Sequence, residues 1–489
     1  MKKPKLIDNL IENDLIFYLL LALGSFYRFY KFDSWSFSND ELSAISRLNF
    51  DSFAELISHG VKIDGHPAVT QLFEYLWIQV FAISTIRIPF VLFGILTIYF
   101  LYRTAVLWIG KFPSLFVAAF VVVSQFFVLY SQIARPYSLG CFLTVLFAYF
   151  WTLLIKRKQS YSTSIGFVIV AVFAALSHYF ATLAIIILSI SGLFVCPKER
   201  IKKYFFHLLF IVVSCLPHLS ITIHQLSIGG VGAWLPAPKP GFIWEFLNYS
   251  SNGFLPFQVS VIIAAILPLF ITDSRDYKIP LIVIALCVFI FSFLVGYFYS
   301  TGINPVLQFS TLIFSFPFFL IFLFAGSRYE HHKKLGLLIL LLMVATGSYG
   351  LLIERDFYGP KKSANFRDVA ENVQHYTDSL GSENLLLFMN SSDSSYFNYY
   401  FDKSGERPVV DIPFFGGYRE IAHAQQLLSN DSVDYVMLAW ANSTMPFEIH
   451  ELIKKSFPNR IVHHHYFNSE FTIYKKGISD RISLFHRTI

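Results

Sequence analysis

The sequence predicts a polytopic α-helical membrane protein with a small C-terminal α/β domain outside the membrane, and its composition is the first observation behind this prediction. Hydrophobic residues make up 55% of the 489 residues and include 55 Phe, whereas charged residues make up 14%, against about 25% in soluble domains. One globular core could not bury so many apolar side chains, so lipid must cover much of the surface. This composition excludes an ordinary soluble enzyme.

The second observation is the length of the apolar runs. Runs of about 17–22 residues can each cross the hydrocarbon layer as a helix, and the sequence predicts about eleven of them between residues 14 and 352. If residues 68–84 do not span, basic clusters fall in every second loop, and the positive-inside rule places these clusters and the N-terminus in the cytoplasm. Because residues 68–84 include Gln71, Glu74 and Gln79, we expect a juxtamembrane helix there, at the outer interface or within the bundle.

The third observation is a shift to polar composition near the C-terminus. Short apolar runs at 385–389, 409–412, 433–438, 461–465 and 471–474 alternate with helical patterns at 366–380, 419–428 and 447–457, which indicates an α/β domain. We therefore expect a transmembrane domain over 1–352, with a first outer loop at about 31–87, and an extracytoplasmic domain over 353–489.

Several function classes find no support in the sequence. The four cysteines lie in or beside apolar runs, which predicts neither a disulfide framework nor a Cys-based metal site. The sequence has no Gly-rich phosphate loop and no nucleotide fingerprint, so an enzyme that uses ATP or a nucleotide sugar is not indicated. Basic residues fall at membrane edges and form no Lys/Arg-rich face, so we expect no nucleic-acid partner.

Two adjacent acids, Asp40 and Glu41, follow the first predicted span in aromatic and apolar surroundings. Partial desolvation near a membrane raises the pKa of a carboxyl group and makes the carboxylate a better proton acceptor, so one of them could be a general base. Alternatively, both acids stabilise the start of a helix near Leu42.

Two further motifs of the outer face carry groups that could bind phosphate. His66 stands in a Gly-His-Pro turn and could bind a phosphate or a metal, or simply cap the helix that follows. Arg135 precedes Pro136 at a predicted helix start, where helix N–H groups and a guanidinium suit an anionic phosphate. Snorkelling towards lipid headgroups is the alternative for Arg135.

Arg87 and the pair His178-Tyr179 lie at the ends of other predicted spans. Arg87 is either an interfacial anchor or a phosphate contact. Ionisable residues in spans usually face the bundle interior and indicate function, but His178 could equally be a hydrogen-bonded core residue. The run His463-His464-His465 cannot bind one metal ion with all three rings, because neighbouring residues of a strand point to opposite faces.

Together these motifs resemble the GT-C superfamily of polytopic glycosyltransferases, in particular the bacterial relatives of protein O-mannosyltransferases and of the lipid A aminoarabinose transferase. The resemblance covers residues 15–210 by motif and the rest by layout. The motifs that carry it are Asp40-Glu41, Gly65-His66-Pro67, Arg87-Ile88-Pro89, Ala134-Arg135-Pro136-Tyr137-Ser138-Leu139 and His178-Tyr179-Phe180.

The resemblance implies an inverting transfer of a hexosyl or pentosyl group from a polyprenyl-phosphate donor to an acceptor hydroxyl on the outer face, in a bacterial inner membrane. By resemblance, Asp40 is the base, Glu41 positions it, and Arg135 holds the donor phosphate with help from Arg87. His66, Tyr137, His178 and Tyr179 would line the substrate pocket. The expected partners are the lipid-linked donor, membrane lipid and a glycan, lipid or protein acceptor.

The sequence departs from the family pattern in three places. Ile133 stands where relatives often have an acid, which weakens the expectation of a divalent metal near Asp40, Glu41 and His66. Ala68 replaces a second proline. The segment 304–310 lacks an arginine that relatives often carry. Either Arg135 does more of the phosphate binding, or Lys239 supplies a second cation; Lys239 could also be a simple loop charge. A transporter or flippase for a lipid-linked glycan and a non-catalytic subunit of an envelope complex are the alternatives.

Overall fold

The computed structural model describes residues 11–156, 160–228, 235–271, 279–329, 332–359, 365–393, 395–404, 418–429 and 432–477. By internal contacts the chain forms two compact units, which we call the helical unit (Met1–Phe32 with Arg47–Tyr358) and the α/β unit (Asp33–Ser46 with Gly359–Ile489). The segment Asp33–Ser46 therefore belongs with the C-terminal part of the chain. The domain boundary that the sequence suggests at residue 352 stays a prediction.

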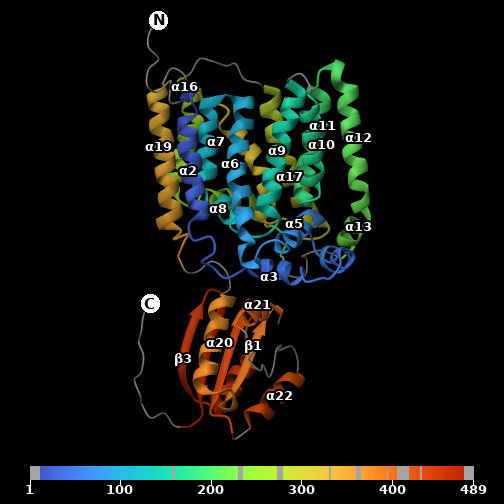
Figure 1. Ribbon diagram of the computed structural model, residues 1–489. Helices are drawn as coiled ribbons and strands as arrows, with labels where there is room; N and C mark the ends of the chain where they lie inside the picture. Colours follow the sequence, from blue (N-terminus) through green and yellow to red (C-terminus); the bar gives the residue numbers. More distant parts are fainter. Residues whose placement is uncertain are drawn as a thin grey trace. The chain divides into compact units, whose positions relative to one another are not determined.

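The helical unit is a bundle of long apolar helices joined by short ones (Figure 1). Its helices are α2 (Leu15–Phe29), α4 (Phe53–Glu55), η1 (Leu56–Val61), α5 (Ala68–Ile78), η2 (Ile83–Thr85), α6 (Arg87–Ile109), α7 (Lys111–Val123), α8 (Gln125–Ser131), α9 (Pro136–Lys156), α10 (Tyr161–Ala175), α11 (Tyr179–Val195), η3 (Lys198–Arg200), α12 (Ile201–Cys215), η4 (Leu216–His218), α13 (Leu219–Ser227), α14 (Phe242–Ser250), α15 (Leu255–Ile266), α16 (Pro268–Ile271), α17 (Ile279–Gly302), η5 (Phe309–Phe314), α18 (Phe316–Leu323), α19 (Lys333–Tyr349) and η6 (Gly350–Glu354).

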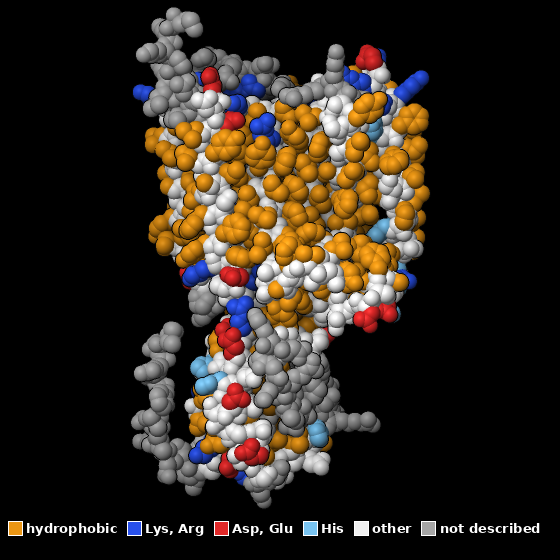
Figure 2. Space-filling model, in the orientation of Figure 1, with side chains coloured by type: hydrophobic (Ala, Val, Ile, Leu, Met, Phe, Trp, Pro, Cys, Tyr) orange, Lys and Arg blue, Asp and Glu red, His pale blue; other side chains and the backbone are white. Residues whose placement is uncertain are grey.

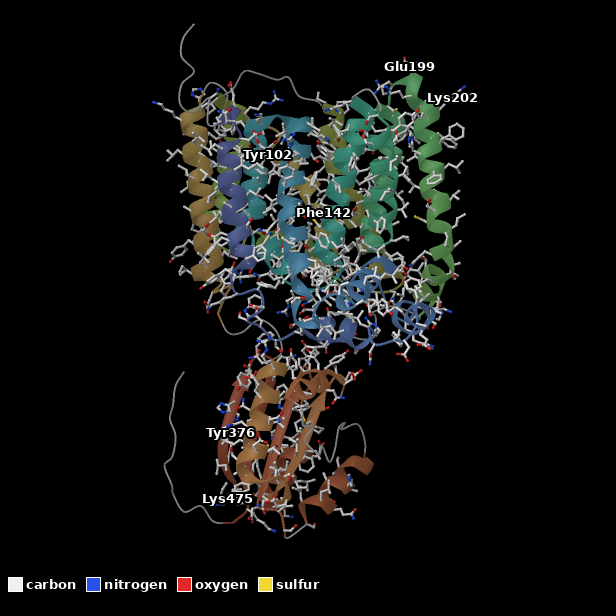
Figure 3. The ribbon with its side chains drawn as sticks, viewed as in Figure 1. Tyr102, Phe142, Glu199, Lys202, Tyr376 and Lys475 are labelled. Atoms are coloured by element: carbon white, nitrogen blue, oxygen red, sulfur yellow. The ribbon has the colours of Figure 1, made fainter. Side chains whose placement is uncertain are left out.

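Length and composition allow five of the described helices to cross a membrane, or seven if each of two bent helix pairs is one span. Three shorter apolar helices, α2, α10 and α11, add to these. Figure 2 shows hydrophobic side chains in a broad band across the helical unit, with charged side chains at its two ends. In Figure 3, Glu199 and Lys202 mark one such end of α12. The chain is an integral membrane protein, and the count of about eleven spans stays a prediction.

The helices of the bundle differ in how far protein surrounds them. In α9, 72% of the apolar stretch is buried within the protein. In the continuous helix Lys198–Ser227, only 11% of the corresponding stretch is buried. The α9 helix is therefore central, whereas α12 and α13 lie at the edge and present apolar side chains to lipid. The helix α5 has 11 residues and is too short to cross the membrane, as the sequence predicts for residues 68–84.

Two helix pairs are sharply bent, which the sequence does not predict. The angle between α7 and α8 is 62°, and the angle between α14 and α15–α16 is 95°. The buried side chain of Asn252, at the second bend, bridges to the first: its Oδ1 accepts from Gln125 N (2.7 Å) and its Nδ2 donates to Val123 O (3.0 Å) and to Gly347 O (2.9 Å). Such bonds satisfy the N–H and C=O groups that lose their helical partners at a break, because no water is available to them within an apolar bundle.

Arg28 near the end of α2 stabilises the same bend and is 1% exposed. Its guanidinium donates to Val121 O (3.0 Å), to Gly24 O (3.2 Å) and to Ser131 Oγ (3.1 Å). In a continuous helix the carbonyl of Val121 would accept from Gln125 N, but Gln125 N donates to Asn252 instead. Arg28 therefore replaces the missing donor. Its positive charge also suits the negative C-terminal end of α7.

The α/β unit contains a four-stranded sheet in the order β1-β2-β4-β3, in which β1 and β2 are parallel and the other pairs antiparallel. Its elements are α3 (Asn39–Ser46), α20 (Phe366–Leu380), η7 (Ser382–Asn384), β1 (Leu385–Ser391), α21 (Ser395–Ser404), α22 (Tyr418–Leu428), β2 (Tyr435–Ala441), α23 (Phe447–Ser456), β3 (Asn459–Tyr466) and β4 (Ser469–Lys475).

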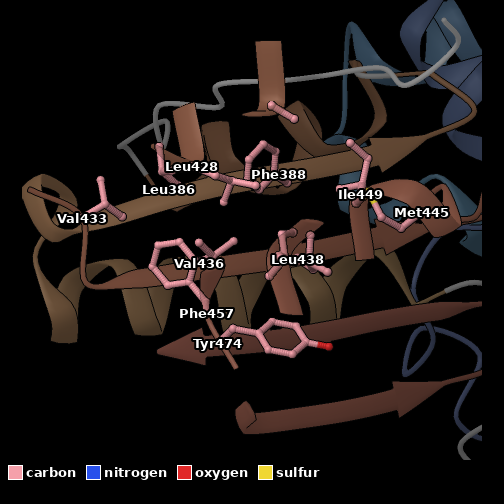
Figure 4. Close-up of a cluster of buried hydrophobic side chains, with 12 residues drawn as sticks. Leu386, Phe388, Leu428, Val433, Val436, Leu438, Met445, Ile449, Phe457 and Tyr474 are labelled. Atoms are coloured by element: carbon pink, nitrogen blue, oxygen red, sulfur yellow. The ribbon is translucent and has the colours of Figure 1, made fainter. Parts of the chain in front are cut away.

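One face of this sheet packs on α22 and α23 through a buried cluster that includes Phe388, Leu438 and Ile449 (Figure 4). Figure 3 labels Tyr376 of α20. Its ring stacks on that of Phe471 of β4, with ring centroids 5.5 Å apart. The sequence predicts four of these strands, whereas its predicted strand at 409–412 lies outside the described residues. It does not predict α21.

Candidate active site

Four charged or ionisable side chains of the helical unit meet at the turn before α5, and we call Arg47, Asp64, His66 and Arg135 the Asp64 cluster. The Asp64 carboxylate accepts from Gly65 N (2.8 Å) and lies 3.2 Å from Arg47 Nη2 and 3.9 Å from Arg135 Nη1. Pro67 and Pro136 open α5 and α9 beside His66 and Arg135 respectively. The helix starts therefore place these side chains where the chain turns.

The cluster is largely shielded from solvent, since the side chains of Arg135 and Asp64 are 7% and 12% exposed. Burial raises the pKa of the Asp64 carboxyl, but Arg135, His66 and Arg47 outweigh this effect and hold that pKa well below its ordinary value. Asp64 is therefore ionised at neutral pH. Two guanidinium groups and one carboxylate leave the cluster with one net positive charge when His66 is neutral, which favours an anionic ligand.

His66 has two competing partners for one ring nitrogen. Its Nδ1 lies 3.1 Å from Arg135 Nη2 and 3.4 Å from Asp64 Oδ1. A guanidinium can only donate, so the shorter contact requires that Nδ1 accept and that the proton reside on Nε2. A ring protonated on Nδ1 would instead donate to Asp64 and release Arg135.

An aromatic group borders the cluster. The ring centroid of His178 lies 5.1 Å from that of His66, 4.5 Å from that of Phe314 and 6.2 Å from that of Tyr137. His178 also caps α11, because its Nδ1 accepts from Phe180 N (3.1 Å). Both interpretations of this histidine, as a hydrogen-bonded structural residue and as part of the surroundings of His66, are therefore compatible with its contacts.

Tyr179 reaches the turn through one intermediary. Its hydroxyl donates to Gln225 Oε1 (2.5 Å), and Gln225 Nε2 donates to the carbonyl oxygens of Val61 and His66 (2.8 Å each). Gln225 thus fixes the backbone on both sides of Asp64. The structure brings His66, Arg135, Tyr137, His178 and Tyr179 into one neighbourhood, and their suggested role in lining a substrate pocket stays a prediction.

Arg87 and Lys239 occupy other positions in the helical unit. Arg87 begins α6, is 4% exposed and donates from Nη1 to Phe32 O (3.2 Å). Lys239 is exposed in the segment before α14. Their suggested phosphate contacts stay predictions.

Asp40 and Glu41 lie on α3 in the α/β unit. Glu41 is buried and forms a capping box, because its Oε2 accepts from Ser38 N (2.9 Å) while Ser38 Oγ accepts from Glu41 N (3.3 Å). The alternative of a helix-stabilising acid therefore describes Glu41. Asp40 is exposed and bonds to nothing in the described part of the chain, so its carboxylate is available for chemistry.

Sequence reasoning did not select Arg47 or Asp64. Asp64 lies two residues before His66, and that spacing in a tight turn is the one signal for it in the sequence. Arg47 gave no signal, because only folding brings it to Asp64. Within the described ranges, no three His, Cys, Asp or Glu side chains are arranged to hold a metal ion. The divalent metal suggested near Asp40, Glu41 and His66 stays a prediction.

No family model matches the chain, and no curated protein sequence matches it. Solved structures do. The crystal structure of ArnT from Cupriavidus metallidurans in the apo state has a TM-score of 0.56 at 10% identity, and the match covers 94% of this chain and 98% of that chain. The same protein bound to undecaprenyl phosphate has a TM-score of 0.52 at 12% identity, with the same coverage of both chains. At these identities the likeness concerns the fold.

Proposed function

Since the chain has the fold of the GT-C superfamily, we propose that it is an inverting glycosyltransferase that moves a sugar from a polyprenyl-phosphate donor to an acceptor hydroxyl. The observation that carries this proposal is the Asp64 cluster, where Arg135 and Arg47 form a shielded site of net positive charge. In support, ArnT was crystallised with undecaprenyl phosphate, a lipid of this class. The reaction takes place on the outer face of a bacterial inner membrane.

The charge of the cluster suits the charge of the proposed donor. A polyprenyl-phosphate sugar is a phosphodiester with one negative charge, which the single net positive charge of the cluster balances. When the sugar leaves, the lipid becomes a phosphomonoester with a charge of about −1.5 to −2. Arg135 and Arg47 stabilise this growing charge, and a preorganised donor set of this kind acts mainly on the transition state.

The remaining steps need a base and an acceptor. Asp40 removes the proton of the acceptor hydroxyl, and the acceptor oxygen attacks the anomeric carbon as the bond from that carbon to the phosphate oxygen breaks. The proton ends on Asp40 and the electron pair on the lipid phosphate. Glu41 contributes by holding the start of α3 through its bonds to Ser38, which fixes the direction of the neighbouring Asp40.

We would test this function with the purified protein, a panel of radiolabelled polyprenyl-phosphate sugars and a crude envelope extract. Wild type should label the extract from one donor, and Asp40→Asn should abolish the label. Arg135→Ala should lower kcat/KM by about 10²–10³-fold, as for loss of one donor to a developing oxyanion. Asp51→Asn, an exposed acid of the same loop, is the matched control. Equal label with Asp40→Asn would remove Asp40 as the base.

The two bent helix pairs favour one alternative, because transporters often bind their cargo at broken helices. A flippase for a lipid-linked glycan would move the donor lipid across proteoliposomes without transferring its sugar. Wild type and Asp40→Asn would then flip equally well, and neither would label an acceptor. That result would replace the transferase proposal.

A further inference from the structure

The segment Asp33–Ser46, which carries Asp40, is an integral part of the α/β unit. It is far in sequence from the rest of that unit, so specific contacts must hold it there. Its helix α3 has eight residues, and a helix of that length is not stable alone in water. The conformation around Asp40 therefore depends on what the C-terminal residues supply.

Arg367, in the first turn of α20, supplies the first set of contacts. Its guanidinium donates to three successive carbonyl oxygens, to that of Ser34 from Nη1 (3.3 Å) and to those of Asp33 (3.3 Å) and Trp35 (3.1 Å) from Nη2. Its backbone N–H donates to Ser36 Oγ (3.0 Å). A planar group with five donors in a fixed fork can bridge several carbonyls at once, whereas the three donors of a lysine radiate from a single nitrogen.

Residues of α21 and of the turn before it continue the contacts towards Asp40. The hydroxyl of Tyr400 accepts from Phe37 N (2.8 Å) and lies 3.0 Å from Ser36 Oγ. The Phe37 ring packs edge-on against Tyr399, with centroids 5.3 Å apart. Ser392 Oγ donates to Asn39 Oδ1, one residue before Asp40. The segment is thus held at nearly every residue from Asp33 to Asn39.

We infer that the α/β unit fixes the conformation of the segment Asp33–Ser46, which carries Asp40, and that Arg367 and Tyr400 are positioning residues for Asp40. This inference rests on the proposed function, in which Asp40 is the base. Arg367 fixes the backbone that enters α3, and Tyr400 fixes the residues that precede its capping box. Misplacement of a reacting group by about 1 Å can lower a rate about 10²-fold, so loss of either contact lowers turnover and leaves donor binding intact.

The test uses the full-length protein in lipid nanodiscs and two independent readouts. Hydrogen exchange of residues 33–46 reports whether the loop is held, and steady-state transfer reports kcat and the donor KM. Arg367→Ala and Tyr400→Phe should each speed exchange in this segment at least tenfold and lower kcat at least tenfold, with donor KM within threefold of wild type. Arg367→Lys, which keeps the charge but not the fork of donors, should fall between Arg367→Ala and wild type.

Arg460→Ala is the matched control, because Arg460 is an exposed arginine of β3 in the same unit. Unchanged exchange of residues 33–46 in Arg367→Ala and Tyr400→Phe would overturn the inference. So would an equal loss of kcat in Arg460→Ala, since that would indicate general destabilisation. Absence of transfer by wild type would overturn the proposed function instead, and exchange would still decide by itself whether the loop is held.

Discussion

At the scale of single residues, the Asp64 cluster joins side chains that are far apart in the sequence. Asp64 and His66 belong to one turn, whereas Arg47 follows α3 directly and Arg135 opens α9. The motifs Gly-His-Pro and Ala-Arg-Pro predict two of these four residues, because each stands at a helix start with a recognisable turn. The partner of Arg135 could not be predicted, since nothing local in the sequence says which carboxylate a distant guanidinium will meet.

The depressed pKa of Asp64 predicts a specific pH dependence of stability. Because the folded-state pKa lies below the unfolded value of about 3.9, the ionised carboxylate stabilises the fold above that pH, and this contribution is lost as the pH falls through the acid range. Asp64→Asn should therefore lower the thermal midpoint at pH 7, by the equivalent of about 3 kcal/mol for breaking a buried ion pair. The gap between variant and wild type should narrow below about pH 4.

Thermal unfolding of both proteins in one detergent, followed from pH 3 to 8, checks this prediction. Asp51→Asn serves as the control for an exposed acid of the same region. A gap of constant size across that pH range would mean that Asp64 does not stabilise the fold through its charge.

At the scale of secondary-structure elements, the two bent helix pairs are what the sequence could not predict. Residues 111–131 read as one continuous apolar run, and the break at Ser124 falls at no proline or glycine. The side chain that bonds to the backbone at this break is Asn252, which is distant in sequence and takes a left-handed conformation at φ 62°. Short elements with local signals, such as α5 and the four strands, were predictable because turn residues and alternation define them.

Asn252 gives the prediction at this scale. Asn252→Ala removes the side-chain partners of Gln125 N, Val123 O and Gly347 O, and each unsatisfied buried group costs about 1–3 kcal/mol. It also places alanine at a left-handed position, at a further cost of about 1 kcal/mol. The thermal midpoint should fall sharply in a detergent-based unfolding assay.

Asn252→Gly separates the two causes, because glycine tolerates the backbone but lacks the amide. It should recover only the smaller part of the loss. Asn248→Ala, at a nearby exposed asparagine, should change stability by less than about 0.5 kcal/mol. Full recovery by glycine would show that backbone conformation, and not the bridging amide, is what Asn252 contributes.

At the scale of the whole molecule, topology follows from composition more directly than any site does. The basic clusters and the non-spanning α5 predict that α10 begins in the cytoplasm and α14 lies outside. Single cysteines at Tyr161 and at Trp244, both exposed positions, test this in a chain whose four native cysteines are replaced. A membrane-impermeant maleimide on intact spheroplasts should label the cysteine at Trp244 and leave the one at Tyr161 unlabelled until the cells are opened. The reverse pattern would invert the predicted orientation.

The α/β unit is built from two segments that are far apart in the sequence, and this arrangement sets an order of events during synthesis. Its first segment, Asp33–Ser46, leaves the ribosome early, and its remainder begins only at Gly359. At about 5–20 residues per second, the loop that carries Asp40 is finished about 15–60 s before the residues that fix it exist. A nascent chain that has inserted every helix of the helical unit therefore still lacks the residues that hold Asp40 in place, and an interrupted translation product leaves this loop without its contacts.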